Sequence, residues 1–193
     1  MSAARPCPRP RPCGSRRAWG WHPLDDGWAR RVVEAAQVRP GELVLDLGAG
    51  GGALTAPLLE AGARVLAVEL HPARAERLRT RFPGRMVTVV ETDLAAVHWP
   101  ARPFRVVASP PYTGTTELLR RLLMARRLVA ADLVLQRSAA RRSVDERVGG
   151  NRWTLSLGMP LPRRAFRPPP RTDSVVLRAR RPTAPERRGR HVY

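Results

Sequence analysis

Short apolar runs alternate with segments of helical periodicity along most of the chain. Runs rich in Val and Leu that stop at glycine, proline or an acidic residue are typical of buried strands. We expect strands at residues 42–47, 64–69, 86–90, 104–108, 132–136, 153–159 and 174–180. Between them, helical spacing of apolar residues predicts helices at residues 25–38, 53–61, 72–82, 116–128 and 138–148. Strands that alternate with helices predict an open, mostly parallel α/β sheet.

A glycine-rich loop directly follows the first expected strand and reads DLGAGGGA over residues 46–53. Glycines let the backbone turn tightly and approach a ligand where a Cβ atom would clash. The spacing Gly48-x-Gly50-x-x-Ala53, with Glu69 at the end of the next strand, also matches the dinucleotide fingerprint loosely. A nicotinamide-dependent dehydrogenase is therefore one alternative.

Three acidic residues stand at successive strand ends: Asp46, Glu69 and Asp93. Parallel strands place their carboxyl ends at one edge of the sheet, so the three carboxylates are expected in one crevice. This ordered set favours S-adenosylmethionine over a nicotinamide cofactor. Asp46 would engage the amino-acid end of that cofactor, Glu69 the ribose hydroxyls and Asp93 the adenine amino group. The alternative is that some of the three are ordinary surface carboxylates.

The tetrapeptide Ser109-Pro110-Pro111-Tyr112 ends the fourth expected strand. Consecutive prolines keep the backbone extended and leave carbonyl groups without competing local donors. The Ser109 hydroxyl and the Pro110 carbonyl can accept hydrogen bonds from an exocyclic amine, and Tyr112 offers a face for stacking of a planar base. An amine held in this way can be methylated directly, without a protein nucleophile. Hydride transfer would have no use for this segment, although a Pro-Pro turn without a binding role is the simpler alternative.

Charge points to a polyanionic partner. The net charge is +19, and all 35 basic residues are Arg. Residues 25–115 are nearly balanced, with eleven Arg against ten acidic residues, so the excess lies on either side of them. We expect nucleic acid to bind there, with the Arg163-Arg164 pair among the phosphate contacts. A solvated, Arg-rich surface is the alternative.

Composition also sets expectations for the ends of the chain and for its location. Residues 1–17 form a Pro- and Arg-rich leader without an apolar stretch, so we expect a disordered basic arm rather than a secretory signal. Residues 182–193 are expected to form a basic tail. The apolar runs are shorter than the ~18 residues that a membrane span needs. With Cys7 and Cys13 in the leader and no metal-ligand spacing, we expect a cytoplasmic protein without a metal.

These motifs together resemble the Erm family, adenine-specific methyltransferases of 23S rRNA, and the related dimethyladenosine transferases of small-subunit rRNA. The resemblance covers about residues 16–181. The matching segments are Gly20–Leu24 (GWHPL), Asp46–Thr55 (DLGAGGGALT), Ala67–Glu69, Thr92-Asp93, Ser109–Tyr112, Leu133–Arg137 (LVLQR) and Phe166–Val175 (FRPPPRTDSV).

The resemblance implies a Rossmann-like class I methyltransferase domain with a seven-stranded sheet, over residues 18–181. It also implies transfer of one or two methyl groups from S-adenosylmethionine to the 6-amino group of an adenine in 23S rRNA. Such methylation confers resistance to macrolides, lincosamides and streptogramin B. The expected substrate is protein-free or precursor rRNA, and the expected form is a monomer.

Residue roles carried over from the family agree with those read from the strand ends. The resemblance places His22 and Leu24 at the methionine end of the cofactor and Gly48 and Gly50 on the cofactor loop. Glu69 falls on the ribose and Asp93 on the adenine of the cofactor. Ser109, Pro110 and Tyr112 fall on the target amine and base, and Ser109 is also expected to contact the cofactor. Phe166 falls on a position that faces the target base, with packing in the core as the alternative.

Three departures from the family pattern define the alternatives. Serine replaces the usual Asn at position 109, the usual Gln-Asn-Phe-Leu opening motif reads Trp21-His22-Pro23-Leu24, and the sequence stops before the family's separate helical domain. Ser-Pro-Pro-Tyr also resembles cytosine amino-methyltransferases of DNA, so DNA cytosine or a protein glutamine is an alternative substrate. A paralogue that binds RNA without methylating it is the non-enzymatic alternative.

Overall fold

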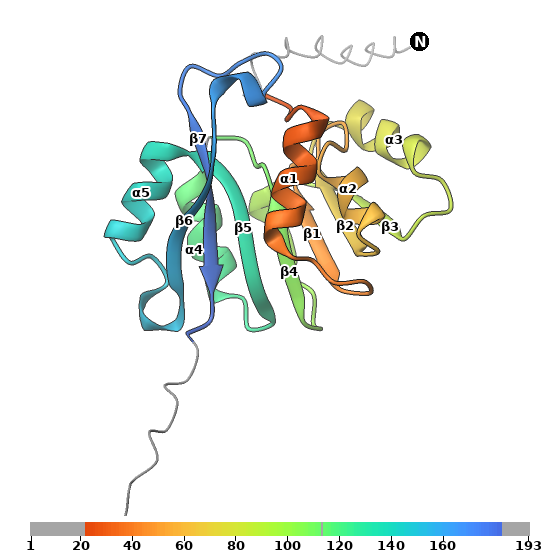
Figure 1. Cartoon of the computed structure of the whole chain (residues 1–193). Helices are drawn as coiled ribbons and strands as arrows, with labels where there is room; N and C mark the ends of the chain where they lie inside the picture. The colour runs from red at the N-terminus through yellow and green to blue at the C-terminus, as the bar shows by residue number, and fades with distance from the viewer. Residues whose placement is uncertain (1–21, 113, 183–193) are drawn as a thin grey trace, which may run out of the picture.

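Seven strands form a single sheet in the computed structural model, which describes residues 22–112 and 114–182. The sheet order is β3-β2-β1-β4-β5-β7-β6 (Figure 1). The strands are β1 (Leu43–Leu47), β2 (Arg64–Glu69), β3 (Val87–Glu91), β4 (Phe104–Ala108), β5 (Leu128–Gln136), β6 (Thr154–Leu161) and β7 (Ser174–Arg180). β7 pairs antiparallel with both β5 and β6 and so runs opposite to the other six strands. The prediction of a mostly parallel, seven-stranded sheet is confirmed.

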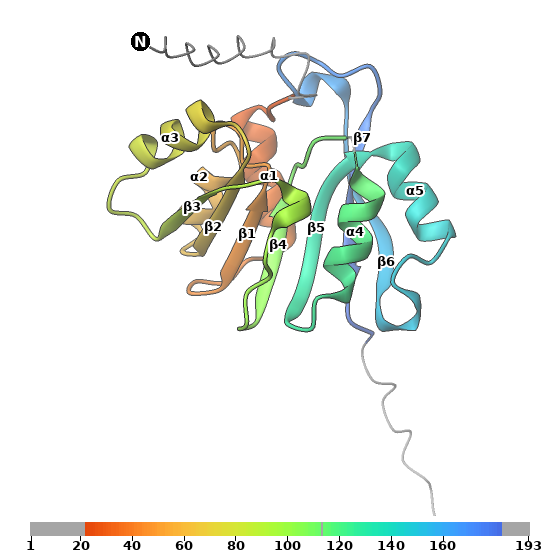
Figure 2. The ribbon, with the colours of Figure 1, turned by 180° about the vertical axis from the view of Figure 1, so that it is seen from behind.

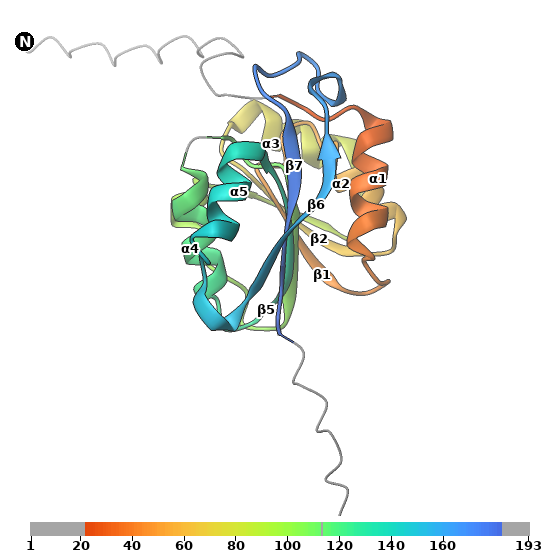
Figure 3. The same ribbon diagram turned by 60° about the vertical axis from the view of Figure 1, so that its left-hand side comes forward.

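Helices cover both faces of this sheet. On one face lie α1 (Asp26–Ala36), α2 (Thr55–Glu60) and α3 (Pro72–Arg81), and on the other lie α4 (Thr115–Met124) and α5 (Arg137–Asp145) (Figures 2 and 3). Each face has its own buried cluster of aliphatic and aromatic side chains. Short 3₁₀ helices, which the sequence pattern did not predict, occur at Leu94–Ala96, Gly150–Arg152 and Arg163–Ala165.

The largest difference from the predicted elements lies at the junction of α4 and β5. We expected a helix to residue 128 and a strand from residue 132, but the helix ends at Met124 and the strand begins at Leu128. Asp132 is therefore a mid-strand residue that is 1% exposed. It is tolerated there because Arg180 on β7 donates to both carboxylate oxygens at 2.8 Å.

The order of the strands determines where a ligand can bind. The chain winds outward from β1 to β3, then returns to β4 on the other side of β1. Sheets of this kind form a crevice at the carboxyl ends of the two strands where the winding reverses. Here these strands are β1 and β4, which lead into the glycine loop and the Ser109–Tyr112 tetrapeptide.

A short antiparallel bridge ties the first described residues to the connection between β6 and β7. Leu24 pairs with Phe166, Asp25 N–H donates to Ala165 O at 2.9 Å, and Arg167 N–H donates to Pro23 O at 3.0 Å. Leu24 is 5% exposed and Phe166 is 1% exposed, within the same buried cluster. The Phe166 ring packs in the core beneath this bridge, as the core-packing alternative expects.

Some expectations fall outside the described part of the chain. These are the basic leader at residues 1–17 and, apart from residue 182, the basic tail. No helix among the described residues is long and apolar enough to span a membrane.

We expect Phe166→Ala to lower the free energy of unfolding by about 3–5 kcal/mol, because truncation leaves a cavity in a packed core. Urea unfolding measures this change. Arg167→Ala is the matched control, since that side chain is 81% exposed and its ion pair with Asp25 is a surface pair; the expected loss is below about 1 kcal/mol. Equal losses in the two variants would contradict the structural role of the Phe166 ring.

Candidate functional site

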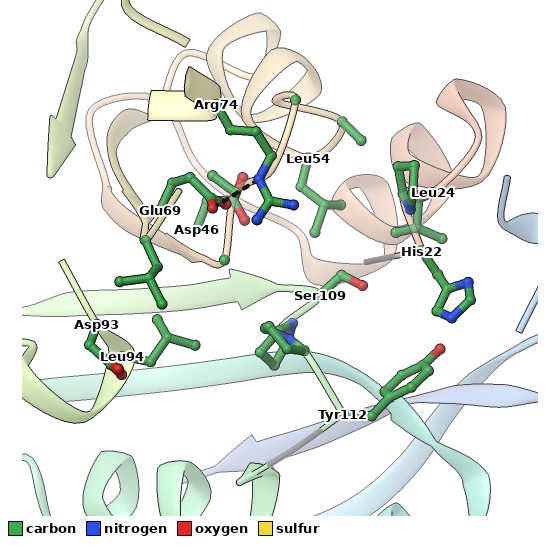
Figure 4. Close-up of a pocket in the computed structure, with 18 residues that line it drawn as sticks. His22, Leu24, Asp46, Leu54, Glu69, Arg74, Asp93, Leu94, Ser109 and Tyr112 are labelled. Carbon is green, nitrogen blue, oxygen red and sulfur yellow. Dashed lines mark ion pairs between the residues drawn. The ribbon is translucent and has the colours of Figure 1, made fainter. Parts of the chain in front are cut away.

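A cavity of about 310 Å³ opens at the carboxyl ends of β1, β2 and β4 (Figure 4). Its volume lies at the lower end of the range for small-molecule sites. Most of the predicted site residues line it, namely His22, Leu24, Asp46, Gly48, Glu69, Asp93, Ser109, Pro110 and Tyr112. Residues from five separate segments of the sequence thus meet in one pocket.

The glycine loop packs directly against the tetrapeptide. Gly48 has φ +76°, a region that favours glycine, and a Cβ atom there would lie 3.0 Å from Pro111 Cδ and 3.5 Å from Pro110 Cα. The amides of Gly48 and Ala49 both donate to Val68 O at the end of β2. The loop is therefore held close to the tetrapeptide, and a larger residue at position 48 would push the two apart.

Glu69 fixes the other side of the glycine loop. Gly50 N–H donates to Glu69 Oε2 at 2.8 Å. Gly50 itself does not line the cavity, so its role is to hold the loop in place. Glu69 Oε1 accepts from His71 N–H at 2.8 Å and lies 3.1 Å from Arg74 Nε. A carboxylate oxygen can accept two hydrogen bonds, so Oε2 keeps acceptor capacity for a ligand hydroxyl.

Asp46 lies at the base of the cavity and is 1% exposed. Burial raises the pKa of Asp46 to about 7; the hydrogen bond from Thr55 opposes this rise, and the nearby Glu69 carboxylate adds to it. Thr55 Oγ1 donates to Asp46 Oδ2 at 2.7 Å. Near neutral pH, a charge that enters the cavity will therefore decide whether Asp46 is ionised.

Asp93 stands beside Leu94, at the end of the cavity away from His22 and Tyr112 (Figure 4). One carboxylate oxygen accepts from Ala95 N–H at 2.8 Å and caps the short helix at Leu94–Ala96. The side chain is otherwise exposed. Its second oxygen can accept a hydrogen bond from a ligand amine.

Tyr112 is anchored at its hydroxyl group. Its Oη lies 3.0 Å from Ser174 Oγ, where β7 begins. Burial raises the pKa of Tyr112, and the hydrogen bond with Ser174 lowers it in part, so the phenol is neutral at physiological pH. The Ser109 side chain lines the cavity between this ring and the glycine loop.

The predicted RNA contacts lie outside the cavity. Arg163 and Arg164 are exposed on a 3₁₀ helix in the connection between β6 and β7. Arg163 Nε donates to Pro170 O at 2.8 Å, which directs that guanidinium along the connection. Within the described ranges, no three His, Cys, Asp or Glu side chains gather as a metal site would require.

Sequence reasoning missed three residues that hold the site together. Thr55 bonds Asp46, Arg74 pairs with Glu69 and Ser174 bonds Tyr112. Arg74 lies in the first turn of α3, five residues after Glu69, so a search for opposite charges near strand ends could have found it. Ser174 is distant from Tyr112 in the sequence, and no local pattern links them.

Comparison with known proteins identifies relatives of the chain. A family model described as ribosomal RNA adenine dimethylase matches residues 24–190. An rRNA methyltransferase of Streptomyces thermotolerans is 36% identical over 175 residues, which cover 84% of this chain and 57% of the relative. The mycinamicin-resistance protein MyrB of Micromonospora griseorubida is 35% identical over 171 residues (84% and 54%). Ribosomal RNA small subunit methyltransferase A of Thermosynechococcus vestitus is 32% identical over 184 residues (84% and 68%).

The chain thus spans just over half the length of the first two relatives. Among solved structures, the 23S rRNA methyltransferase ErmE matches with a TM-score of 0.77 at 30% identity, over 86% of this chain and 72% of that one. The glycopeptide N-methyltransferase MtfA in complex with S-adenosylmethionine matches with a TM-score of 0.56 at 20% identity, over 80% and 87%, and shares the fold alone. The predicted class I methyltransferase fold is confirmed, and the chain belongs to the ribosomal RNA adenine dimethylase family.

Proposed function

We propose that this chain transfers methyl groups from S-adenosylmethionine to the 6-amino group of an adenine in 23S rRNA, and so confers resistance to macrolides, lincosamides and streptogramin B. One observation carries the proposal: the glycine loop lies against the Pro110-Pro111 segment. The contact is so close that a Cβ atom on Gly48 would lie 3.0 Å from Pro111 Cδ. The loop that would hold a cofactor and the segment that would hold an amine therefore share one wall. Transfer between two bound groups requires this proximity.

The residues of the cavity fit S-adenosylmethionine. Gly48, Ala49 and Gly51 line the cavity, so a ligand there can approach the backbone closely because these residues carry no large side chain. The cofactor carries net positive charge, and Asp46, Glu69 and Asp93 line the cavity with carboxylates. Glu69 Oε2 would hold the ribose, Asp93 the adenine, and Leu24 and Asp46 the methionine end. When bound, the cofactor supplies an electrophilic methyl group on a sulfonium.

Ser109, Pro110 and Tyr112 would hold the target amine. The Ser109 hydroxyl and the Pro110 carbonyl would accept its two hydrogens, which makes the nitrogen more tetrahedral and turns its lone pair toward the cofactor side of the cavity. The Tyr112 ring, fixed by Ser174, would stack on the base. The chain supplies position and polarity, and no protein nucleophile is needed.

Relatives support 23S rRNA as the target. ErmE, named as a 23S rRNA methyltransferase, matches at 30% identity, and the resistance protein MyrB matches at 35%. Exposed Arg163 and Arg164, at the same end of the sheet as the cavity, would contact phosphates of a protein-free or precursor rRNA. A second candidate target is small-subunit rRNA, because a small subunit methyltransferase matches at 32% identity over 68% of its length.

The experiment that tests this proposal compares substrates directly. Purified full-length chain is incubated with labelled S-adenosylmethionine and protein-free 23S rRNA, small-subunit rRNA or DNA, and the digested products are identified by mass spectrometry. Methyladenosine from 23S rRNA supports the proposal, and the same product from small-subunit rRNA alone supports the second target. Label in DNA cytosine indicates the alternative amino-methyltransferase. Binding of RNA without any label indicates a paralogue that does not methylate.

We expect substitutions in the tetrapeptide to lower turnover while cofactor binding is retained. Tyr112→Ala removes the stacking face and should lower kcat/KM for RNA by about 10- to 100-fold. Ser109→Ala removes an acceptor for the amine and should lower kcat by about 100-fold, whereas Ser109→Asn, which restores the usual family residue, should keep activity. Calorimetry with S-adenosylhomocysteine provides the control. A Tyr112→Ala chain with unchanged kcat/KM would refute the stacking role.

We also expect cofactor affinity to depend on pH through Asp46. The cationic cofactor favours the carboxylate form of a group whose pKa burial raises to about 7 in the free protein. Affinity should therefore rise between about pH 6 and pH 8. Calorimetry at both pH values measures the rise, and Asp46→Asn should bind more weakly at pH 8 with little pH dependence. A wild-type affinity that is flat across this range would contradict the proposed contact.

The same group should lower the stability of the free protein at alkaline pH. Folding raises the pKa of Asp46 from 3.8 to about 7. The contribution of this residue to the free energy of unfolding is therefore fully present below pH 3.8, and it is lost as the pH rises from 3.8 through 7. The loss is roughly 4 kcal/mol at about 1.4 kcal/mol per unit. Asp46→Asn should therefore be more stable than wild type at pH 8, measured by urea unfolding without cofactor. A less stable Asn variant at that pH would show that the buried charge is not costly.

A further inference from the structure

A second groove, of about 380 Å³, opens at the end of the sheet opposite the cavity. Three arginines line it: Arg64 begins β2, Arg85 stands two residues before β3, and Arg102 stands two residues before β4. No acidic side chain is among the lining residues, which are otherwise mainly apolar. Three separate segments therefore bring positive charge, and no negative charge, to one groove.

The three guanidinium groups have no carboxylate partner among the described residues, and all three residues are exposed. Residues 25–115 carry nearly equal numbers of Arg and acidic residues. Folding directs the acidic residues of this part of the chain to other arginines, which are Arg30, Arg74, Arg79 and Arg105. A half of the chain that is balanced in number is therefore unbalanced in space.

The groove belongs to a wider basic surface at the pole where β7 ends (Figure 2). Each of the parallel strands β1 to β5 begins at, or within four residues after, an exposed arginine. These arginines are Arg39, Arg64, Arg85, Arg102 and Arg127. The acidic residues just before these strands, Glu42 and Glu60, form ion pairs with Arg105 and Arg30. The carboxyl ends of the strands carry the carboxylates of the cavity, and the amino ends carry cations.

Arginines in this arrangement are suited to phosphodiester groups. A guanidinium group is planar and always charged, and it can donate two parallel hydrogen bonds to phosphate oxygens. Three like charges around one groove repel one another when no anion is present. A bound polyanion removes that repulsion, and its binding is further favoured by the release of counterions. RNA is the polyanion that the proposed function brings to this chain.

The groove is too far from the cavity for one nucleotide to reach both. β2 runs from Arg64 at the groove to Glu69 at the cavity, and five residue steps of strand span about 17 Å. In a stacked strand each nucleotide adds at most about 3.4 Å. Phosphates at the groove would therefore lie about five or more nucleotides from the target, or in another part of the folded RNA.

We propose that the groove between Arg64, Arg85 and Arg102 binds the phosphodiester backbone of the RNA substrate at a segment distant from the target nucleotide. This inference rests on the proposed function, because it takes RNA as the substrate. It adds a second RNA-binding surface, at the opposite end of the sheet from Arg163 and Arg164. Counting charges along the sequence placed the RNA contacts outside residues 25–115, whereas this surface is built largely from that balanced part.

The first test measures how binding of protein-free 23S rRNA to the full-length chain depends on salt. The groove variant combines Arg64→Gln, Arg85→Gln and Arg102→Gln. The control variant removes the same charge from exposed positions on α1 and α3 and combines Arg30→Gln, Arg31→Gln and Arg77→Gln. Calorimetry with S-adenosylhomocysteine checks that both variants keep the wild-type affinity for the cofactor product and so are folded.

Loss of three phosphate contacts should lower the slope of log affinity against log salt concentration by about 2 to 3. Between about 50 and 200 mM salt, wild-type affinity should thus fall about 20- to 40-fold more than that of the groove variant. The control variant should keep the wild-type slope. Equal slopes in the two variants would overturn the proposal, since the effect would then belong to net charge and not to the groove.

A second measurement observes the groove directly by NMR. Met86 lines the groove and is 57% exposed, so an isotope label in the methionine methyl groups reports whether the groove is occupied. Met159 on β6, at the other edge of the sheet, is the reference. A short oligouridylate is titrated into the chain saturated with S-adenosylhomocysteine. The Met86 methyl signal should shift in wild type and stay in place in the groove variant, while the Met159 signal stays in place in both.

The two measurements separate the groove from the proposed function. Failure of wild type to methylate any RNA overturns the proposed function, and both binding measurements still decide the groove. Oligouridylate that saturates the wild-type chain without moving the Met86 signal overturns the groove, even where methylation of 23S rRNA is found.

Discussion

The close approach of Gly48 to Pro111 is the contact on which the arrangement of the site depends. It joins the loop after β1 to the loop after β4, the two strands between which the winding of the sheet reverses. Glycine is required there for two reasons: the backbone has φ +76°, and a Cβ atom would meet the proline ring at 3.0 Å. Glu69 secures the far side of the same loop through Gly50 N–H. The loop residues 48–50 are thereby held at fixed distances from both the Glu69 carboxylate and the Ser109–Tyr112 tetrapeptide.

Asp46 illustrates how such a site departs from what stability alone would favour. A carboxylate that is 1% exposed, with Thr55 as its one hydrogen-bonding side chain, costs free energy in the empty protein. A neutral amide of the same shape would avoid that cost. The charge becomes favourable only when a cation lies beside it, so the residue is suited to the bound state of the pocket rather than to the free state.

The fold and most of the pocket could be predicted from sequence because their signals are local. Apolar runs that end at glycine or at an acidic residue gave the strands, and parallel strands then brought Asp46, Glu69 and Asp93 to one edge. Interactions between distant residues were harder to predict. Asp132 looked like the start of a strand because its partner Arg180 is 48 residues away. The sequence left two roles open for Phe166, since the bridge that covers it comes from distant Leu24. Ser174 was missed for the same reason.

The antiparallel course of β7 separates the two ends of the domain. The first described residues lie at the mouth of the cavity, whereas β7 carries the chain away from it along the full height of the sheet. Seven residues of strand span about 23 Å. The chain thus enters the described domain at residue 22, beside the cavity, and leaves it at residue 182, at the opposite pole. An RNA substrate as proposed would therefore meet the point of entry near its target nucleotide and the point of exit at a distant part of the same molecule.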